Sequence, residues 1–82
     1  MVRRNMKHQG KFFLFNEKKR QYFHARGVSD DGSGPVAYTH WTPYFAGAMG
    51  FGTVKAARAM QNTLMNQREK CVIITRNREV VP

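Results

Sequence analysis

The amino-acid sequence predicts an α+β fold, in which one helix packs on one face of a three- to four-stranded, mostly antiparallel sheet. Two observations lead to this class. Short β-rich stretches separated by turn residues fill the first half of the chain, and an amphipathic stretch with helical spacing precedes one last apolar stretch. The expected element order is strand, strand, strand, helix, strand. A chain of 82 residues makes a single small domain with a thin core.

The first two expected strands form a hairpin. Residues 11–16, KFFLFN, place four apolar residues in a row with high β propensity. Residues 20–26, RQYFHAR, follow after the turn residues NEKK. Two strands this close in the sequence are typical of an antiparallel hairpin.

A loop and a third strand come next. Residues 27–35, GVSDDGSGP, contain three of the seven glycines and a proline, which indicates a surface loop. Residues 36–41, VAYTHW, are rich in β-branched and aromatic side chains and predict the third strand. Residues 42–52 are punctuated by glycine yet apolar, so we expect them to fold back over the core.

The helix is expected at about residues 54–68. Thr53 suits the N-cap, because its hydroxyl can accept a hydrogen bond from a backbone N–H that has no intrahelical partner. The side expected to dock on the sheet carries Ala56, Ala57, Met60 and Leu64. The side expected to face water carries Lys55, Arg58, Asn62 and Asn66.

The chain is expected to end in a strand and a tail. Residues 71–75, CVIIT, are too apolar for a strand on an unprotected sheet edge. We therefore divide the chain into a flexible basic arm at residues 1–10, a single α+β domain at 11–76 and a basic C-terminal tail at 77–82.

The composition excludes several classes of protein. Cys71 is the only cysteine, so neither an internal disulfide nor a site with several thiolate ligands for zinc can form. No apolar run approaches the ~20 residues that span a bilayer, and the first ten residues lack the apolar core of a signal peptide. We expect a cytoplasmic protein with no membrane partner, no metal and no other cofactor.

The charge points to an anionic partner. Fourteen Lys and Arg face five Asp and Glu, which gives a formal net charge of +9. Such an excess favours binding to nucleic acid, the most common anionic partner. The expected partner is RNA, single-stranded DNA, or an acidic or ribonucleoprotein host complex, and a homodimer is also compatible with the sequence.

The hairpin carries the strongest candidate site. Strand alternation places four residues on one side of the second strand, namely Arg20, Tyr22, His24 and Arg26. A turn of two or four residues brings Phe13 and Phe15 beside them, whereas a three-residue turn brings Phe12 and Leu14. Rings among cations suit single-stranded nucleic acid, because each stacked base contributes about 1–3 kcal/mol. The alternative is that the rings are core and the arginines extend along its rim.

The other expected contacts come from the basic arm, the turn and the helix. In a second hypothesis the protein docks on a host protein complex, with the aromatic residues Trp41, Tyr44 and Phe45 as anchors. The full set of predicted binding residues is Arg3, Arg4, Phe13, Phe15, Lys18, Lys19, Arg20, Tyr22, His24, Arg26, Trp41, Tyr44, Lys55 and Arg58.

Residues 47–61, GAMGFGTVKAARAMQ, set three glycines before the helix. Helix N-termini attract anions, so a phosphate site is one interpretation. A P-loop needs Lys followed by Ser or Thr after its last glycine, and this stretch has neither that pair nor the context of a dinucleotide fingerprint. The segment is better interpreted as a helix-entry turn, with Lys55 and Arg58 at the border of a basic surface.

The third hypothesis is enzymatic. His8, His24 and His40 are the only side chains that titrate near neutral pH, and a His or Tyr with several cations is the material of metal-independent, toxin-like ribonucleases. Their spacing matches no metal site or catalytic triad. A non-enzymatic binding module is therefore our principal hypothesis, and no residue is assigned a catalytic role.

The layout KFFLFN, then FGTVKAARAM, then CVIIT, from Lys11 to Thr75, resembles small accessory proteins of phages and mobile elements. That resemblance implies stoichiometric binding to a host machine, as inhibitors of CRISPR effectors and other defence complexes do. Many such inhibitors are acidic mimics of nucleic acid, and the charge of +9 departs from that pattern. It implies instead the capture of guide RNA, target DNA or an acidic protein surface.

Overall fold

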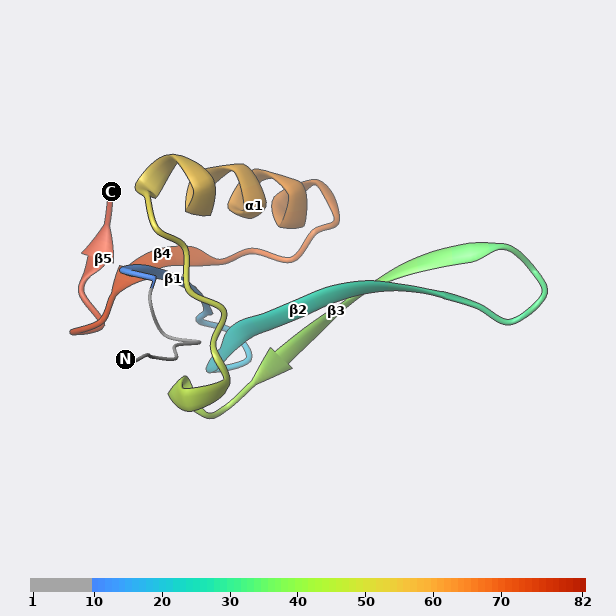
Figure 1. The fold of residues 1–82 in the computed structure, drawn as a ribbon, viewed down its shortest axis with the longest axis horizontal. Helices are drawn as coiled ribbons and strands as arrows, with labels where there is room; N and C mark the ends of the chain where they lie inside the picture. The colour runs from blue at the N-terminus through green and yellow to red at the C-terminus, as the bar shows by residue number, and fades with distance from the viewer. Residues whose placement is uncertain (1–9) are drawn as a thin grey trace, which may run out of the picture.

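In a computed structural model, which describes residues 10–82, the protein is a five-stranded antiparallel sheet with one α-helix on one face (Figure 1). The α+β class is thus confirmed. Along the chain the elements are β1 (Phe12–Asn16), β2 (Gln21–Asp30), β3 (Pro35–Thr42), the 3-10 helix η1 (Phe45–Gly47), α1 (Val54–Asn66), β4 (Val72–Thr75) and β5 (Val80–Val81). The spatial order is β3-β2-β1-β4-β5.

The strand β5 adds one strand to the predicted number. It lies inside the segment that we predicted as a tail, and it pairs with β4 through Ile73 opposite Val81 and Ile74 opposite Val80. As a result β4 is flanked by β1 and β5, which confirms that the apolar 71–75 stretch avoids the sheet edge. The predicted basic arm lies outside the described residues except for Gly10, which is buried.

The central strand β1 is apolar on both faces. Leu14 belongs to the larger core cluster, on the α1 side, and Phe13 belongs to a smaller one on the opposite side. A four-residue turn at 17–20 sets Phe15 opposite Tyr22, one of the two pairings expected from the sequence. The buried Asn16 Oδ1 accepts a hydrogen bond of 3.0 Å from the Lys19 backbone N–H, which closes this turn.

The helix α1 begins where the sequence predicts. The Thr53 hydroxyl accepts a hydrogen bond of 3.1 Å from the Ala56 backbone N–H, as expected of an N-cap. Ala57 and Leu64 are fully buried against the sheet. Ala56, which was expected to dock as well, is exposed. It lies about 100° around the helix from Ala57 and outside the apolar stripe.

The β2–β3 hairpin is longer than predicted. Most of the expected loop at 27–35 is strand, and only residues 31–34 turn the chain. The Asp30 carboxylate holds this turn by accepting hydrogen bonds from the backbone N–H groups of Gly32 and Gly34. Figure 1 shows the hairpin extending well away from the rest of the sheet. Within it the Tyr38 ring lies directly over Gly27, where a Cβ would stand 2.3 Å from the Tyr38 hydroxyl oxygen.

A close backbone contact joins Gly10, two residues before β1, to Gly50 in the segment before α1. A Cβ on Gly50 would stand 2.9 Å from the Gly10 Cα and 3.3 Å from a ring atom of Phe13. Backbone hydrogen bonds between Phe12 and Phe51 hold the two segments in this position. The glycine at position 50 therefore permits close packing, whereas Gly52 has open space around its Cα.

The substitution Gly50→Ala is expected to lower the free energy of unfolding by about 1–3 kcal/mol, because the added methyl overpacks a backbone contact. Urea denaturation followed by circular dichroism measures the change. The matched control is Gly52→Ala, which should change the free energy of unfolding by less than about 0.5 kcal/mol. Equal effects of the two substitutions would contradict the assignment of Gly50 to a packing role.

Candidate nucleic-acid interface

The sheet face opposite α1 carries a cluster of aromatic rings. Phe15, Tyr22 and Phe45 are each half-buried, and we call them the open-face cluster. The ring centroids of Phe15 and Tyr22 lie 5.1 Å apart, and those of Tyr22 and Phe45 lie 5.4 Å apart. The cluster joins β1, β2 and η1, and its rings are partly accessible because the three-residue η1 covers far less of the sheet than α1 does.

Two arginines extend the cluster from the turn between β4 and β5. The Arg78 guanidinium carbon lies 4.1 Å from the centroid of the Phe45 ring, and that of Arg76 lies 5.8 Å from the centroid of the Phe13 ring. Arg78 has a φ of 65°, and its side chain donates a 3.0 Å hydrogen bond to the Arg76 carbonyl. Cations and rings from distant parts of the chain thus meet on one face, an arrangement that favours cation–π contact.

A small pocket of about 280 Å³ lies beside Phe15, Tyr22 and Arg78. Phe15 and Tyr22 line one part, the apolar side chains of β4 and β5 line another, and Arg78 and Glu17 supply the charges. A pocket with aromatic walls and one cation suits a flat, electron-rich group such as a nucleobase.

Phe13, which was predicted to contact a partner, is fully buried. Its ring packs against Phe45 with centroids 4.7 Å apart, so it forms part of the buried layer on which the open-face cluster packs. The alternative interpretation, in which a ring of the first strand is core, holds for Phe13. Phe15 remains partly accessible beside Tyr22.

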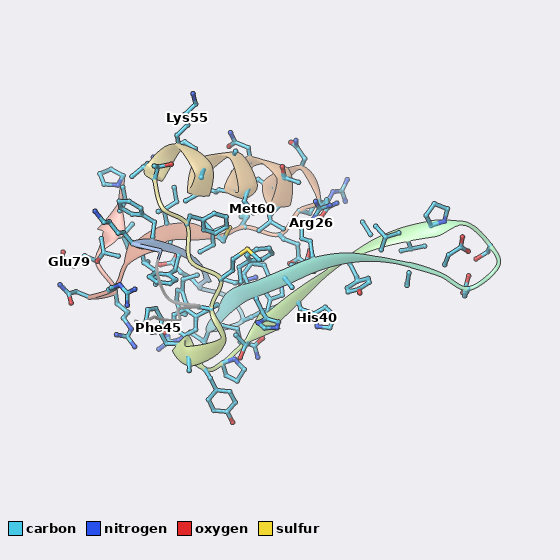
Figure 2. All side chains as sticks on the ribbon, viewed as in Figure 1. Arg26, His40, Phe45, Lys55, Met60 and Glu79 are labelled. Atoms are coloured by element: carbon cyan, nitrogen blue, oxygen red, sulfur yellow. The ribbon has the colours of Figure 1, made fainter. Side chains whose placement is uncertain are left out.

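A β-bulge at His24 changes the side on which Arg26 lies. Strand pairing shifts from Phe23 opposite Trp41 to Ala25 opposite His40, so one extra residue enters β2. Alternation after the bulge puts Arg26 on the α1 side of the sheet, away from Tyr22. In Figure 2 Arg26 extends from β2 toward α1, whereas His40 lies on the other side of the hairpin. The prediction that Arg26 lies on the same side of the second strand as Tyr22 is therefore wrong.

A second group of cations lines a groove at one end of the sheet. The groove has a volume of about 1200 Å³ and lies between the turn at 17–20 and the segment after α1. Its basic residues are Lys18, Lys19, Arg68 and Lys70, and its acidic residues are Glu17 and Glu69. Glu17 and Val72 also line the small pocket, so the groove and the pocket adjoin each other. Arg20 is exposed at the end of the same turn.

The cations of α1 do not join these surfaces. Lys55 is exposed in the first turn of the helix. Arg58, which was expected to face water, is half-buried and donates a 2.8 Å hydrogen bond to the carbonyl oxygen of Pro82. It therefore holds the end of the chain against α1. Arg3 and Arg4 lie outside the described residues.

The other predicted aromatic and histidine residues include some that are part of the core and some that are exposed. Trp41 is half-buried and packs edge-on against Phe23 with centroids 6.0 Å apart, so it belongs to the helix-side core and is no exposed anchor. Tyr44 is 73% exposed. His24 Nδ1 lies 2.6 Å from the Gly47 carbonyl oxygen, which ties β2 to η1, and His40 stacks edge-on with Tyr38. His8 lies outside the described residues.

Reasoning from the sequence missed Arg68, Lys70, Arg76 and Arg78 as site residues. The signal for the last two was the triplet RNR directly after the apolar strand β4, which is typical of a tight turn rather than a tail. For Arg68 and Lys70 no local signal exists, because their neighbours in the groove come from a turn about fifty residues earlier.

Comparison of the chain with models of protein families, with curated proteins and with solved structures finds no match. Among residues 10–82, no three His, Cys, Asp or Glu side chains group in a way that could hold a metal ion. In the same part of the chain, no helix has the length and apolar content to cross a bilayer.

Cys71 borders the groove but is buried, and that burial raises the pKa of its thiol to about 11. We expect its alkylation rate to keep rising through pH 10, because the thiolate is the reactive form. An unperturbed thiol is half ionised near pH 8.5, so its alkylation rate would level off at about pH 9.5. Mass spectrometry after timed iodoacetamide pulses measures the rate, with the urea-unfolded protein as control. A plateau at about pH 9.5 in the folded protein, as in the unfolded control, would contradict the burial of this thiol.

Proposed function

We propose that this protein is a non-enzymatic basic module that binds single-stranded nucleic acid, free or within a ribonucleoprotein, through the open-face cluster. The observation that supports the proposal is that three partly accessible rings share one sheet face with Arg78, which lies over the Phe45 ring, and with Arg76, which lies over the buried Phe13 ring. Stacking platforms for single strands combine rings with cations in this way. The net charge of +9 adds a general attraction to phosphate.

In the proposed complex a base enters the small pocket beside Phe15 and Tyr22. Arg78 offers a second flat cationic surface, so the base stacks between rings and guanidinium. Glu17 at the pocket edge repels phosphate and can accept a hydrogen bond from a base amino group. The phosphates then follow the cations of the adjoining groove, including Lys18 and Lys19.

The substitution Tyr22→Ala is expected to weaken binding to a fluorescein-labelled single-stranded oligonucleotide by about 5- to 150-fold, which corresponds to the loss of one stacked base. Fluorescence anisotropy at low salt measures the dissociation constant for RNA and DNA of the same sequence. Tyr22→Phe should retain most of the affinity. The matched control is Tyr44→Ala, which removes a more exposed tyrosine outside the cluster.

Two results of this experiment would overturn the proposal. One is the absence of binding to any single-stranded oligonucleotide at low salt. The other is an equal loss of affinity for Tyr22→Ala and Tyr44→Ala.

A Lys18→Ala, Lys19→Ala double variant separates charge from stacking. It should lower the salt dependence of log K by about 1.4, because each phosphate that is no longer neutralised by a lysine reduces the slope by about 0.7.

The second candidate function is docking on a host protein complex, as the phage-type resemblance implies. It is favoured by the 73% exposure of Tyr44 beside η1, in a stretch from residue 32 to 54 that carries no Lys, Arg, Asp or Glu. Anchors of this kind bind by burial rather than by charge. A partner that is captured from nuclease-treated lysate and lost with Tyr44→Ala, but not with Tyr22→Ala, would favour docking over nucleic-acid binding.

The ribonuclease hypothesis has its own test. His40 is the β3 partner of Ala25, and the bulge places His24 beside Ala25. Both imidazoles therefore lie on the face opposite α1. Labelled RNA incubated with purified protein either stays intact, as we expect of a binding module, or is cleaved. Cleavage that disappears with His24→Ala or His40→Ala would replace the binding proposal by an enzymatic one.

A further inference from the structure

The distal part of the β2–β3 hairpin, residues 25–40, buries little of its surface, and we call it the hairpin arm. Val28 is 65% exposed, Val36 58% and Tyr38 41%. Figure 1 shows the hairpin arm extending beyond the layers formed by α1 and the rest of the sheet. A two-stranded ribbon alone in water is marginally stable, so a hairpin arm of this length is expected to gain stability from a partner.

The outer strand of the hairpin arm lacks the usual protection of a sheet edge. Within residues 10–82, β2 is the only neighbour of β3, so one side of its backbone is open to a further strand. Charged side chains, bulges and prolines normally block such pairing. β3 contains no Lys, Arg, Asp or Glu, its only proline is the first residue, and the bulge of the hairpin lies in β2.

The charges of the hairpin indicate what occupies this edge. Residues 32–54 carry no Lys, Arg, Asp or Glu, so β3 offers no cation to a phosphate backbone. Asp30 and Asp31, two of the five acidic residues of the chain, stand at the tip of the hairpin arm. The basic residues of the described chain lie on the body, apart from Arg26 near the base of the hairpin arm. Two hairpin arms laid antiparallel would thus set each acidic tip beside the basic body of the other molecule.

We propose that the β3 edge is a self-association surface, on which β3 of a second copy of this chain pairs antiparallel. The two strands would lie side by side, with Tyr38 near the middle of β3 opposite Tyr38 of the second copy, and would join two five-stranded sheets into one. Val36, Tyr38 and His40, which alternate along one face of β3, would then form one stripe with their counterparts. The hairpin arms would also hold the two positively charged bodies apart.

This association does not depend on the proposed nucleic-acid binding. A two-fold axis between antiparallel edge strands runs perpendicular to the sheet. Both α1 helices would therefore lie on one face of the joined sheet and both open-face clusters on the other. A strand of nucleic acid could reach both clusters, but the dimer is expected to form without it.

The full-length protein, freed of nucleic acid, is expected to dimerise, so that sedimentation equilibrium gives twice the chain mass of 9.5 kDa. Val36→Lys should raise the dimer dissociation constant at least tenfold, because it places two lysines in the shared stripe. Val28→Lys is the matched control, since Val28 is similarly exposed in the hairpin arm but lies on β2. Circular dichroism establishes that both variants are folded.

Three results would overturn the proposal. The first is a monomer at every concentration up to the solubility limit. The second is an equal effect of Val36→Lys and Val28→Lys. The third is a mass that keeps growing with concentration, because an isologous β3 pair is closed and stops at two copies.

A thiol at the centre of β3 locates the contact. Tyr38→Cys is expected to form disulfide-linked dimers in air, whereas Val28→Cys should remain monomeric in denaturing electrophoresis; the buried Cys71 supplies little background. Equal cross-linking of the two cysteine variants would argue against pairing at β3.

Asp30→Asn combined with Asp31→Asn retains the hydrogen-bond acceptors of the turn and should weaken the dimer more at low salt than at high salt.

Discussion

The structure depends on the burial of β1 on both of its faces. Leu14 and Phe13, neighbours in sequence, are both completely excluded from water, although they point in opposite directions. Within residues 10–82 one α-helix packs on one face of the sheet, and the opposite face is covered by the short 3-10 helix η1 and irregular chain. The segment around η1 and Ala48 does so, and it is held there by hydrogen bonds from Met49 to Phe23 and from Phe51 to Phe12.

The candidate site follows from the difference between the two covers. The thirteen-residue α1 packs on its face of the sheet with Ala57 and Leu64 fully buried, whereas the three residues of η1 leave Phe15, Tyr22 and Phe45 half-buried on the other face. Arg76 and Arg78 extend over this incomplete cover, because the left-handed backbone of Arg78 turns β5 back along β4. A surface of rings and cations can therefore form where a small domain has too few residues to bury all of its aromatic side chains.

The hairpin shows how one inserted residue changes which side chains share a face of the sheet. Without the bulge at His24, Arg26 would share a face with Tyr22 and the hairpin arm would continue the open-face cluster. With the bulge, Arg26 lies on the α1 side of the sheet. The hairpin arm has Asp30 and Asp31 at its tip and no charged side chain on β3, so the molecule has two chemically distinct surfaces, one cationic and aromatic on the body and one uncharged along the β3 edge.

The sequence by itself determined the α+β class, the Thr53 cap and the protected position of β4, because local propensity, hydrogen bonding and apolar patterning decide these features. It left two pairings open for the first hairpin, and the four-residue turn of the structure selects the one that sets Phe15 opposite Tyr22. Tertiary structure decided the rest. Phe13 is buried in the core, Arg58 donates a hydrogen bond to Pro82, and Arg26 lies on the opposite side of the sheet from the one expected. Lys18 and Arg68 line the same groove. None of these outcomes follows from neighbours along the chain, since each depends on which distant segment covers or pairs with the residue, and a single bulge or a short cover alters that without any local signal.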